Sequence, residues 1–195
     1  MVACLFACKS VKLFAERCIK AMKRLIYDRL LEWKNKADRK PLILNGARQV
    51  GKTWILKEFG ANEYSNVAYI NCDEVEEMKT LFSDFNTERL IRSISVLSGE
   101  TIKPGETLIV LDEIQVVPSG ITSLKYFCEN ASDYHIVVAG SLLGIGLHGG
   151  TGFPVGKVDE INLYPLSFKE FLMALGKDVL ISSMEEHRWS KNKNL

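Results

Sequence analysis

The most informative segment of this 195-residue chain reads Gly46-Ala47-Arg48-Gln49-Val50-Gly51-Lys52-Thr53, which satisfies the pattern G-x-x-x-x-G-K-[ST]. A short apolar run, Leu42–Asn45, precedes it, and a segment with helical character, Lys52–Phe59, follows it. A strand, a glycine-rich loop and a helix in this order bind a polyphosphate, because backbone N–H groups of the loop and the helix N-terminus point at the phosphate oxygens. Gly46 and Gly51 allow backbone geometry that a Cβ would obstruct. All eight residues are therefore predicted to bind the phosphates of a nucleotide.

Two side chains of this segment have specific expected roles. Lys52 is predicted to reach the β- and γ-phosphates and to stabilise the charge that develops there during catalysis. The Thr53 hydroxyl is predicted to bind Mg²⁺, the metal that accompanies a nucleoside triphosphate.

A second apolar run, Thr107–Glu113, ends in two acids. The carboxyl end of a parallel strand is where α/β sheets bind ligands. Asp112 is predicted to hold Mg²⁺ through water. Glu113 is predicted to be the base that polarises a water molecule for attack on the γ-phosphate, as in the additional-strand, catalytic-glutamate branch of P-loop enzymes.

A third apolar run, Tyr134–Ser141, ends in a small polar residue. Ser141 is predicted to lie between the phosphate loop and the acidic strand end and to act in catalysis within reach of the γ-phosphate or the attacking water; the alternative is a residue that merely ends the strand.

Arg48, Arg92 and Lys157 are candidates for a further cation near the phosphates. For each of these three a surface charge is the favoured interpretation, and Lys157 is the best candidate among them because it follows a glycine-rich segment.

Outward from these motifs, short apolar runs alternate with amphipathic helical segments, which is typical of an α/β fold with a parallel sheet covered by helices on both faces. Five strands are predicted, at Leu42–Asn45, Asn66–Cys72, Thr107–Glu113, Tyr134–Ser141 and about Glu160–Leu163. Helices are predicted at Lys52–Phe59, Val75–Phe82, Thr87–Leu97, Ile121–Asn130 and Ser167–Leu175, the last beginning with a capping box of Ser167 and Glu170.

Together these residues resemble the bacterial and archaeal AAA-type ATP-binding proteins, in which an N-terminal P-loop domain precedes an uncharacterised, nuclease-like C-terminal domain. The similarity runs from about Met22 to Gly176. It rests on Gly46–Thr53, Leu111-Asp112-Glu113-Ile114-Gln115, Ala139-Gly140-Ser141, Phe153-Pro154-Val155-Gly156-Lys157 and Leu163-Tyr164-Pro165-Leu166-Ser167-Phe168. The resemblance implies an AAA-like sheet in which the Ser141 strand lies between the strands that end in the phosphate loop and in Asp112. It also implies ATP rather than GTP as the ligand. Family members are much longer, so a C-terminal domain is expected to be missing from this chain.

The N-terminal part of the chain is basic. Residues 1–45 hold 11 Lys and Arg against 4 Asp and Glu. Apolar residues at three- and four-residue steps predict a basic amphipathic helix: Val11, Phe14, Cys18, Met22, Leu25, Ile26, Leu30 and Trp33. A helix docked on the core with a solvated basic face is the favoured interpretation, and contact with a membrane surface or nucleic acid is the alternative. The expected organisation is therefore a basic helical extension over 1–40, a P-loop ATPase domain over 41–176 and the start of a truncated C-terminal region over 177–195.

Composition excludes several classes of protein. With 47% hydrophobic and 25% charged residues and a net charge of +1, the chain is neither disordered nor broadly basic. No apolar stretch approaches the roughly 18 residues of a membrane-spanning helix, and a secretory signal is not recognisable, so a cytoplasmic protein with no integral membrane association is predicted. The five cysteines lack the spacing of a zinc site or disulfide framework.

The predicted function is Mg²⁺-dependent ATP binding and ATP hydrolysis, with ATP and Mg²⁺ as the only ligands implied. AAA-type sites commonly lie at a subunit boundary, which makes a homo-oligomer a candidate assembly; no protein or nucleic-acid partner is indicated. One alternative is a nucleotide-binding module with little or no turnover, and another is a small-molecule kinase. A GTPase is disfavoured because the guanine-type pattern Asn35-Lys36-Ala37-Asp38 lies in a charged helix before the phosphate loop.

Overall fold

The computed structural model describes residues 24–141 and 153–192. These residues belong to two compact units, one spanning Ile26–Pro165 and the other combining the chain up to Leu25 with the chain from Leu166 onward. The part of the predicted basic helix that precedes residue 24 lies outside the described residues.

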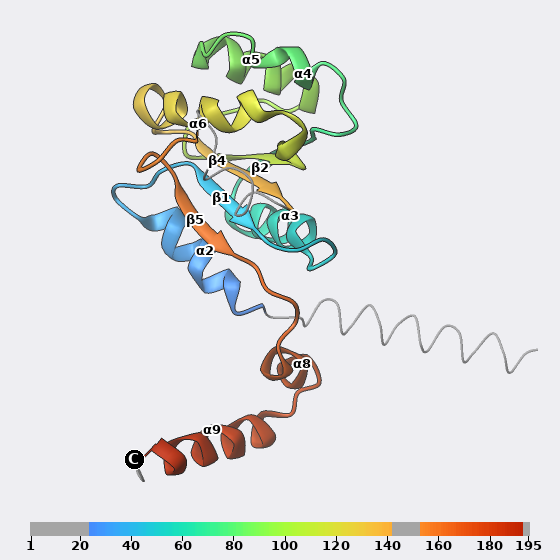
Figure 1. Ribbon diagram of the computed structural model, residues 1–195, viewed down its shortest axis with the longest axis vertical. Helices are drawn as coiled ribbons and strands as arrows, with labels where there is room; N and C mark the ends of the chain where they lie inside the picture. The colour runs from blue at the N-terminus through green and yellow to red at the C-terminus, as the bar shows by residue number, and fades with distance from the viewer. Residues whose placement is uncertain (1–23, 142–152, 193–195) are drawn as a thin grey trace, which may run out of the picture. The chain divides into compact units, whose positions relative to one another are not determined.

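The larger unit is built on a five-stranded, all-parallel sheet with the order β2-β3-β4-β1-β5 (Figure 1). The strands are β1 (Leu42–Asn45), β2 (Asn66–Asn71), β3 (Thr107–Asp112), β4 (His135–Gly140) and β5 (Asp159–Asn162). The predicted α/β class and strand number are confirmed, and each strand ends within one residue of its predicted limit. β4 lies between β1 and β3, as the resemblance implies.

Helices cover both faces of the sheet because the strand residues alternate between them. Leu42 and Leu44 face one core, shared with α2 (Ile26–Asn35) and α3 (Lys52–Glu63). Ile43 faces the other core, which is formed with α4 (Met78–Leu81), α5 (Thr87–Ser98), the 3₁₀ turn η1 (Ile114–Val116) and α6 (Pro118–Asn130). The central strands β3 and β4 are buried along their whole length, which is why they read as continuous apolar runs in the sequence.

Three helices differ from the predicted limits by more than one residue. α3 continues to Glu63, four residues beyond the predicted end at Phe59. α4 is a single turn, Met78–Leu81, although Val75–Phe82 was predicted, since Glu74 to Glu77 form turns before it. α6 begins three residues earlier than predicted because Pro118 occupies its first turn, where a missing N–H costs nothing.

Helix α2 contributes directly to the core of the larger unit. Its residues Ile26, Leu30 and Trp33 are buried against the sheet face that α3 also covers. The charged side of this helix is exposed, in agreement with a helix docked on the core. The predicted domain limits at residues 40 and 176 stay predictions.

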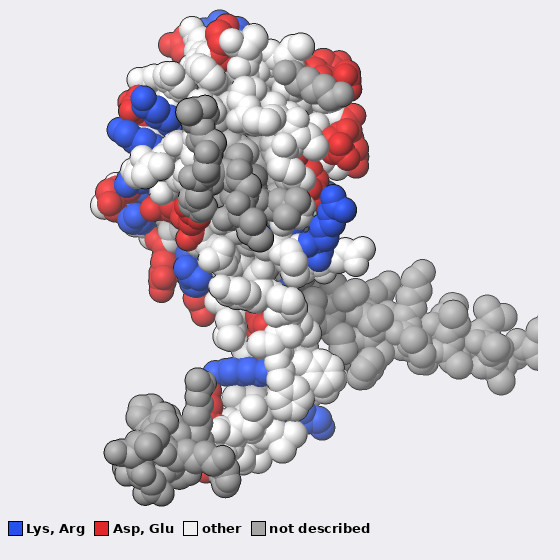
Figure 2. All heavy atoms as spheres, viewed as in Figure 1, with Lys and Arg blue, Asp and Glu red and all other residues white. Residues whose placement is uncertain are grey.

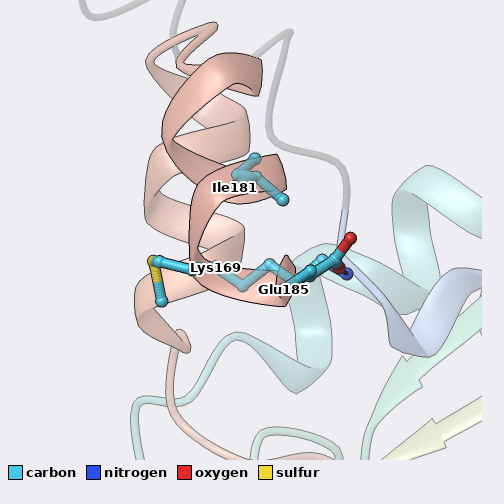
Figure 3. A pocket seen from close by; sticks show the side chains of 4 residues that line it. Lys169, Ile181 and Glu185 are labelled. Atoms are coloured by element: carbon cyan, nitrogen blue, oxygen red, sulfur yellow. Dashed lines mark hydrogen bonds and ion pairs between the residues drawn. The ribbon is translucent and has the colours of Figure 1, made fainter. Parts of the chain in front are cut away.

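The smaller unit contains α8 (Phe168–Ala174) and α9 (Asp178–Asn192). The predicted capping box is confirmed: Ser167 Oγ accepts from Glu170 N, and the Glu170 carboxylate accepts from Ser167 N. The same carboxylate binds Arg24 Nε at 3.0 Å in a buried ion pair. Lys169 of α8 and Glu185 of α9 form an ion pair at a pocket of about 150 Å³, which Ile181 and Met184 also line (Figure 3).

The surface carries both signs of charge. Basic and acidic side chains lie in small groups among uncharged residues on the face shown in Figure 2, and neither sign covers that face. Across the described residues, no helix combines the length and apolar character that crossing a membrane requires.

Candidate functional site

The glycine-rich loop connects β1 to α3 at the carboxyl edge of the sheet. Gly51 ends the loop in a left-handed conformation with φ +93°, and Gln49 is left-handed as well, with φ +62°. Gly46 is required for a different reason. A Cβ on this residue would lie 2.6 Å from the carbonyl oxygen of Leu163, because the chain leaving β5 runs against the loop and Leu163 N donates to Asn45 O at 2.7 Å.

The Lys52 ammonium lies inside the curl of this loop. Its Nζ donates to Gly46 O at 2.9 Å and to Ala47 O at 2.8 Å, and the residue is only 6% exposed. Burial lowers the pKa of Lys52 below its ordinary value, and the carboxylates of Glu113 and Asp112 act in the opposite direction. The loop therefore holds a buried cation whose contacts in the loop are neutral carbonyls, which suits an anionic ligand.

Thr53 and Asp112 meet beside the loop. Thr53 Oγ1 donates to Asp112 Oδ2 at 2.5 Å, and Glu113 N donates to Asp112 Oδ1 at 3.0 Å. Asp112 is 2% exposed. Mg²⁺ prefers oxygen ligands and is usually bound by one or two protein oxygens together with water and substrate phosphate. A hydroxyl from the first turn of α3 next to a strand-end carboxylate fits that requirement.

Glu113 follows β3 directly and has a left-handed backbone with φ +52°. This turn starts η1, whose residue Ile114 is fully buried and anchors the turn in the core. The Glu113 carboxylate accepts a short hydrogen bond from Gln115 Nε2. Gln115 belongs to a sequence motif that suggested the family, but the sequence assigned it no role.

Three buried side-chain oxygens near the carboxyl ends of the strands have no hydrogen-bond partner among residues 24–141 and 153–192. They are Asn45 Oδ1, Gln115 Oε1 and Ser141 Oγ. An unsatisfied buried polar group costs about 1–3 kcal/mol. Ser141 follows Gly140, which pairs in register with Asn45 at the start of the loop. The predicted position of Ser141 between the phosphate loop and the acidic strand end agrees with this register, and its hydroxyl accepts and donates no hydrogen bond within the part of the chain that the structure describes.

Tyr69 is a further site residue that the sequence analysis missed. Its hydroxyl donates to Asp112 Oδ2 at 3.1 Å, and Lys57 Nζ lies 4.0 Å from the centroid of its ring. Burial, followed by the nearby Asp112 charge, raises the pKa of Tyr69 well above its ordinary value, so the hydroxyl keeps its proton and can donate.

Of the three candidate cations, only Arg48 belongs to the loop itself. Lys157 was the best of the three candidates, but it lies away from the loop, and the structure agrees with the surface charge that was favoured for it. Lys157 precedes β5, whose first residue Asp159 pairs with Leu42 at the amino edge of the sheet, and Lys157 Nζ binds Glu129 at 2.9 Å. The phosphate loop lies at the opposite edge. Arg92 pairs with Glu88 on the exposed side of α5.

Comparison with known proteins places this geometry in context. Residues 38–172 match a family model described as an AAA domain. The Walker-type ATPase PABY2304 of Pyrococcus abyssi is similar in structure, with a TM-score of 0.52 and 18% identity over 80% of this chain and 57% of that chain. The Aeropyrum pernix Orc1 protein in complex with DNA gives a TM-score of 0.46 at 20% identity, over 83% of this chain and 47% of that chain. At these identities the likeness concerns the fold, and the chain spans little more than half the length of the Pyrococcus protein. No curated protein sequence matches the chain.

Proposed function

The chain belongs to the AAA domain family, and from that premise we propose that it binds Mg·ATP at the Gly46–Thr53 loop and hydrolyses the bond between the β- and γ-phosphates. ATP binding and ATPase activity are properties expected of the family. The proposal adds to these a requirement for magnesium, turnover of ATP and roles for single residues.

One observation carries the proposal. A buried ammonium, Lys52 Nζ, lies in the loop and donates hydrogen bonds to the neutral carbonyls of Gly46 and Ala47. It lies within the electrostatic influence of two carboxylates, Asp112 and Glu113. A polyphosphate with its metal supplies the complementary charges to both groups at once: phosphate oxygens to the ammonium, and a divalent cation to the carboxylate edge.

Different groups of the site would bind the phosphates and the metal. Backbone N–H groups of Gly46–Thr53 and the Lys52 ammonium would hold the β- and γ-phosphates. The Thr53 hydroxyl oxygen and the Asp112 carboxylate would hold Mg²⁺, which neutralises phosphate charge when it is bound. These two residues already contact each other through the Thr53–Asp112 hydrogen bond.

The hydrolytic step requires a base and a donor. Glu113 would accept a proton from the attacking water as its oxygen bonds to the γ-phosphorus, while the bond from that phosphorus to the β–γ bridging oxygen breaks and ADP leaves with the electron pair. Ser141 Oγ, which is buried and has no hydrogen-bond partner among the described residues, would donate to a γ-phosphate oxygen or contact the water. Lys52 would stabilise the charge on the transferred group.

A binding module with little turnover is the second candidate function. The hydrogen bond from Gln115 Nε2 to the Glu113 carboxylate favours it, because it occupies Glu113 Oε2, an oxygen that could otherwise accept a hydrogen bond from the attacking water. Measuring turnover beside affinity separates the two candidates.

The test of the proposal is nucleotide binding by Lys52→Ala. A fluorescent ATP analogue titrated with Mg²⁺ should bind the wild-type protein and should fail to bind the variant, because the phosphate charge is then uncompensated in the loop. Lys103→Ala is the matched control, since Lys103 is an exposed lysine of the same unit that pairs with Glu106. Equal affinity of wild type and Lys52→Ala would refute the phosphate-loop assignment.

Assembly and context remain predictions. A homo-oligomer with a cation supplied from a neighbouring subunit and a nuclease-like C-terminal domain in a longer protein follow from the resemblance alone. A cytoplasmic location is predicted from the sequence pattern alone. The family model ends at residue 172, within α8.

A further inference from the structure

We propose that Tyr69 is a positioning residue for the magnesium site, holding the Asp112 carboxylate in the orientation that binds the metal. The inference rests on the proposed function, because it concerns how the same site binds Mg²⁺. It assigns a role to an aromatic residue on β2 that lies in neither the phosphate loop nor the acidic strand end.

The sheet brings Tyr69 to Asp112. β2 pairs with β3 so that Tyr69 is opposite Val110 and Asn71 is opposite Asp112. Residues opposite each other, and those two apart along one strand, point to the same face. Tyr69 and Asp112 are therefore diagonal neighbours on one face, within reach of a long aromatic side chain. Val110 on this face packs in the core that α3 covers.

Asp112 receives three hydrogen bonds from three different segments. Thr53 Oγ1 from α3 and Tyr69 OH from β2 both donate to Oδ2, at 2.5 and 3.1 Å. Glu113 N donates to Oδ1 at 3.0 Å. The bond from Glu113 comes from the adjacent residue and fixes only one oxygen. Thr53 and Tyr69 together fix the other oxygen, so that the carboxylate plane cannot rotate without losing one of them.

Helix α3 holds this arrangement at two points. Thr53 and Lys57 are four residues apart on α3, so they lie on one face of the helix one turn apart. Thr53 binds Asp112, and Lys57 Nζ lies 4.0 Å from the Tyr69 ring centroid. A cation over the face of a tyrosine is attracted by the ring, and this contact restrains the ring whose hydroxyl reaches Asp112. The helix that begins at the phosphate loop thus contacts both the metal-binding carboxylate and the residue that orients it.

Hydrogen-bond donors behind a ligating carboxylate commonly alter metal affinity about 10–100-fold when they are removed. Tyr69→Phe deletes one oxygen atom and keeps the ring, the core contacts and the Lys57 contact. The variant therefore isolates the hydrogen bond to Asp112.

The test measures the Mg²⁺ concentration that gives half-maximal binding of the fluorescent ATP analogue, together with binding in EDTA. For Tyr69→Phe we expect the Mg²⁺ midpoint to rise about tenfold, while binding in EDTA stays within about twofold of wild type. Tyr27→Phe is the matched control, because the Tyr27 hydroxyl donates to Glu63 at the other end of α3. Its Mg²⁺ midpoint should equal that of wild type. Lys57→Met should raise the midpoint in the same direction by a smaller factor.

Each other result overturns the inference. An unchanged Mg²⁺ midpoint in Tyr69→Phe, with a wild-type protein that needs Mg²⁺, removes Tyr69 from the metal site and leaves the proposed function intact. Equal losses with and without Mg²⁺, or a thermal midpoint far below that of Tyr27→Phe, assign Tyr69 to structure alone. A wild-type protein that binds no ATP analogue, or binds it without regard to Mg²⁺, refutes the proposed function, and the role of Tyr69 falls with it.

Discussion

Gln115 donates its side-chain amide to the carboxylate of Glu113 across a single 3₁₀ turn that the buried Ile114 holds in place. The two side chains belong to residues two apart, and the turn between them is anchored in the core. The Glu113 carboxylate therefore has a fixed orientation before any ligand arrives, and its contribution to chemistry can be separated from binding by mutation.

Glu113→Gln should retain nucleotide affinity and lose most hydrolysis. General-base assistance is typically worth about 10²–10⁴-fold in rate, whereas Lys52, Thr53 and Asp112 still hold the nucleotide and metal in the variant. Phosphate release at saturating ATP and the affinity for the ATP analogue should be measured on the same samples. Glu106→Gln, an exposed residue of the same unit, is the control. A rate in Glu113→Gln equal to a wild-type rate that is clearly above background would exclude Glu113 as the base.

GTP should not outcompete ATP. The guanine-type pattern Asn35–Asp38 lies just before β1, and its Lys36 binds Asp159, the first residue of β5, at 2.8 Å. That position is the amino edge of the sheet, opposite the phosphate loop, so this pattern cannot contact a base bound with its phosphates at Gly46–Thr53. Competition of unlabelled ATP and GTP against the fluorescent analogue measures the preference. A clear preference for GTP would contradict this prediction and would support the interpretation of the protein as a GTPase.

Gly46→Ala should lower both stability and nucleotide binding. The added Cβ would lie 2.6 Å from the backbone carbonyl oxygen of Leu163, so the loop or the chain after β5 has to move. Such crowding typically costs about 1–3 kcal/mol. Gly105→Ala is the control: Gly105 has φ +70° with open space around it, so its strain of about 1–2 kcal/mol comes without a clash. Chemical denaturation and analogue binding test both variants. If Gly46→Ala binds the analogue as well as Gly105→Ala does, close packing at Gly46 does not matter for the loop.

The stability of the larger unit should fall between about pH 6.5 and pH 4 because of His135. Burial, with the nearby Arg39 and Lys34 charges, lowers the pKa of His135 from 6.5 to about 4, and its Nδ1 lies 2.7 Å from the Tyr64 hydroxyl oxygen. The unfolded chain binds a proton below its ordinary pKa and the folded chain does not, so the free energy of unfolding decreases as the pH falls through this window. The loss at pH 4 is on the order of 3 kcal/mol.

His135→Gln is the matched variant for this effect. It should be less stable than wild type at pH 7.5 and should show a shallower decline toward pH 4, measured by urea unfolding at several pH values. Parallel pH profiles for the two proteins would show that another group causes the acid sensitivity.

How much of the fold and the candidate site can be predicted from the sequence depends on whether a feature is encoded by local residue types or by contacts between distant segments. The loop and the acidic strand end were located correctly because their residue types have few other uses at those positions. The position of β4 between β1 and β3 came only from family resemblance, since apolar runs determine that strands exist and not which strands are neighbours.

The errors and omissions have physical causes as well. Lys157 follows a glycine-rich segment, but sequence proximity does not reveal which edge of the sheet that segment reaches. Tyr69 was missed because an aromatic residue in a strand is usually a core residue, and its hydrogen bond to Asp112 depends on the β2–β3 register. Gln115 belongs to the motif Leu111–Gln115, but its contact with Glu113 depends on the turn after β3, which brings its side-chain amide to the Glu113 carboxylate.

The two hydrogen bonds from Lys52 Nζ to backbone carbonyl oxygens also affect how tightly a nucleotide can bind. A free lysine side chain loses up to about 2 kcal/mol of conformational entropy when a ligand immobilises it. Here Gly46 O and Ala47 O already restrict the side chain inside the loop. The side chain therefore loses most of this entropy when the chain folds. When a nucleotide binds, the ammonium only exchanges its carbonyl partners for phosphate oxygens, so little further entropy is lost and the affinity is reduced less.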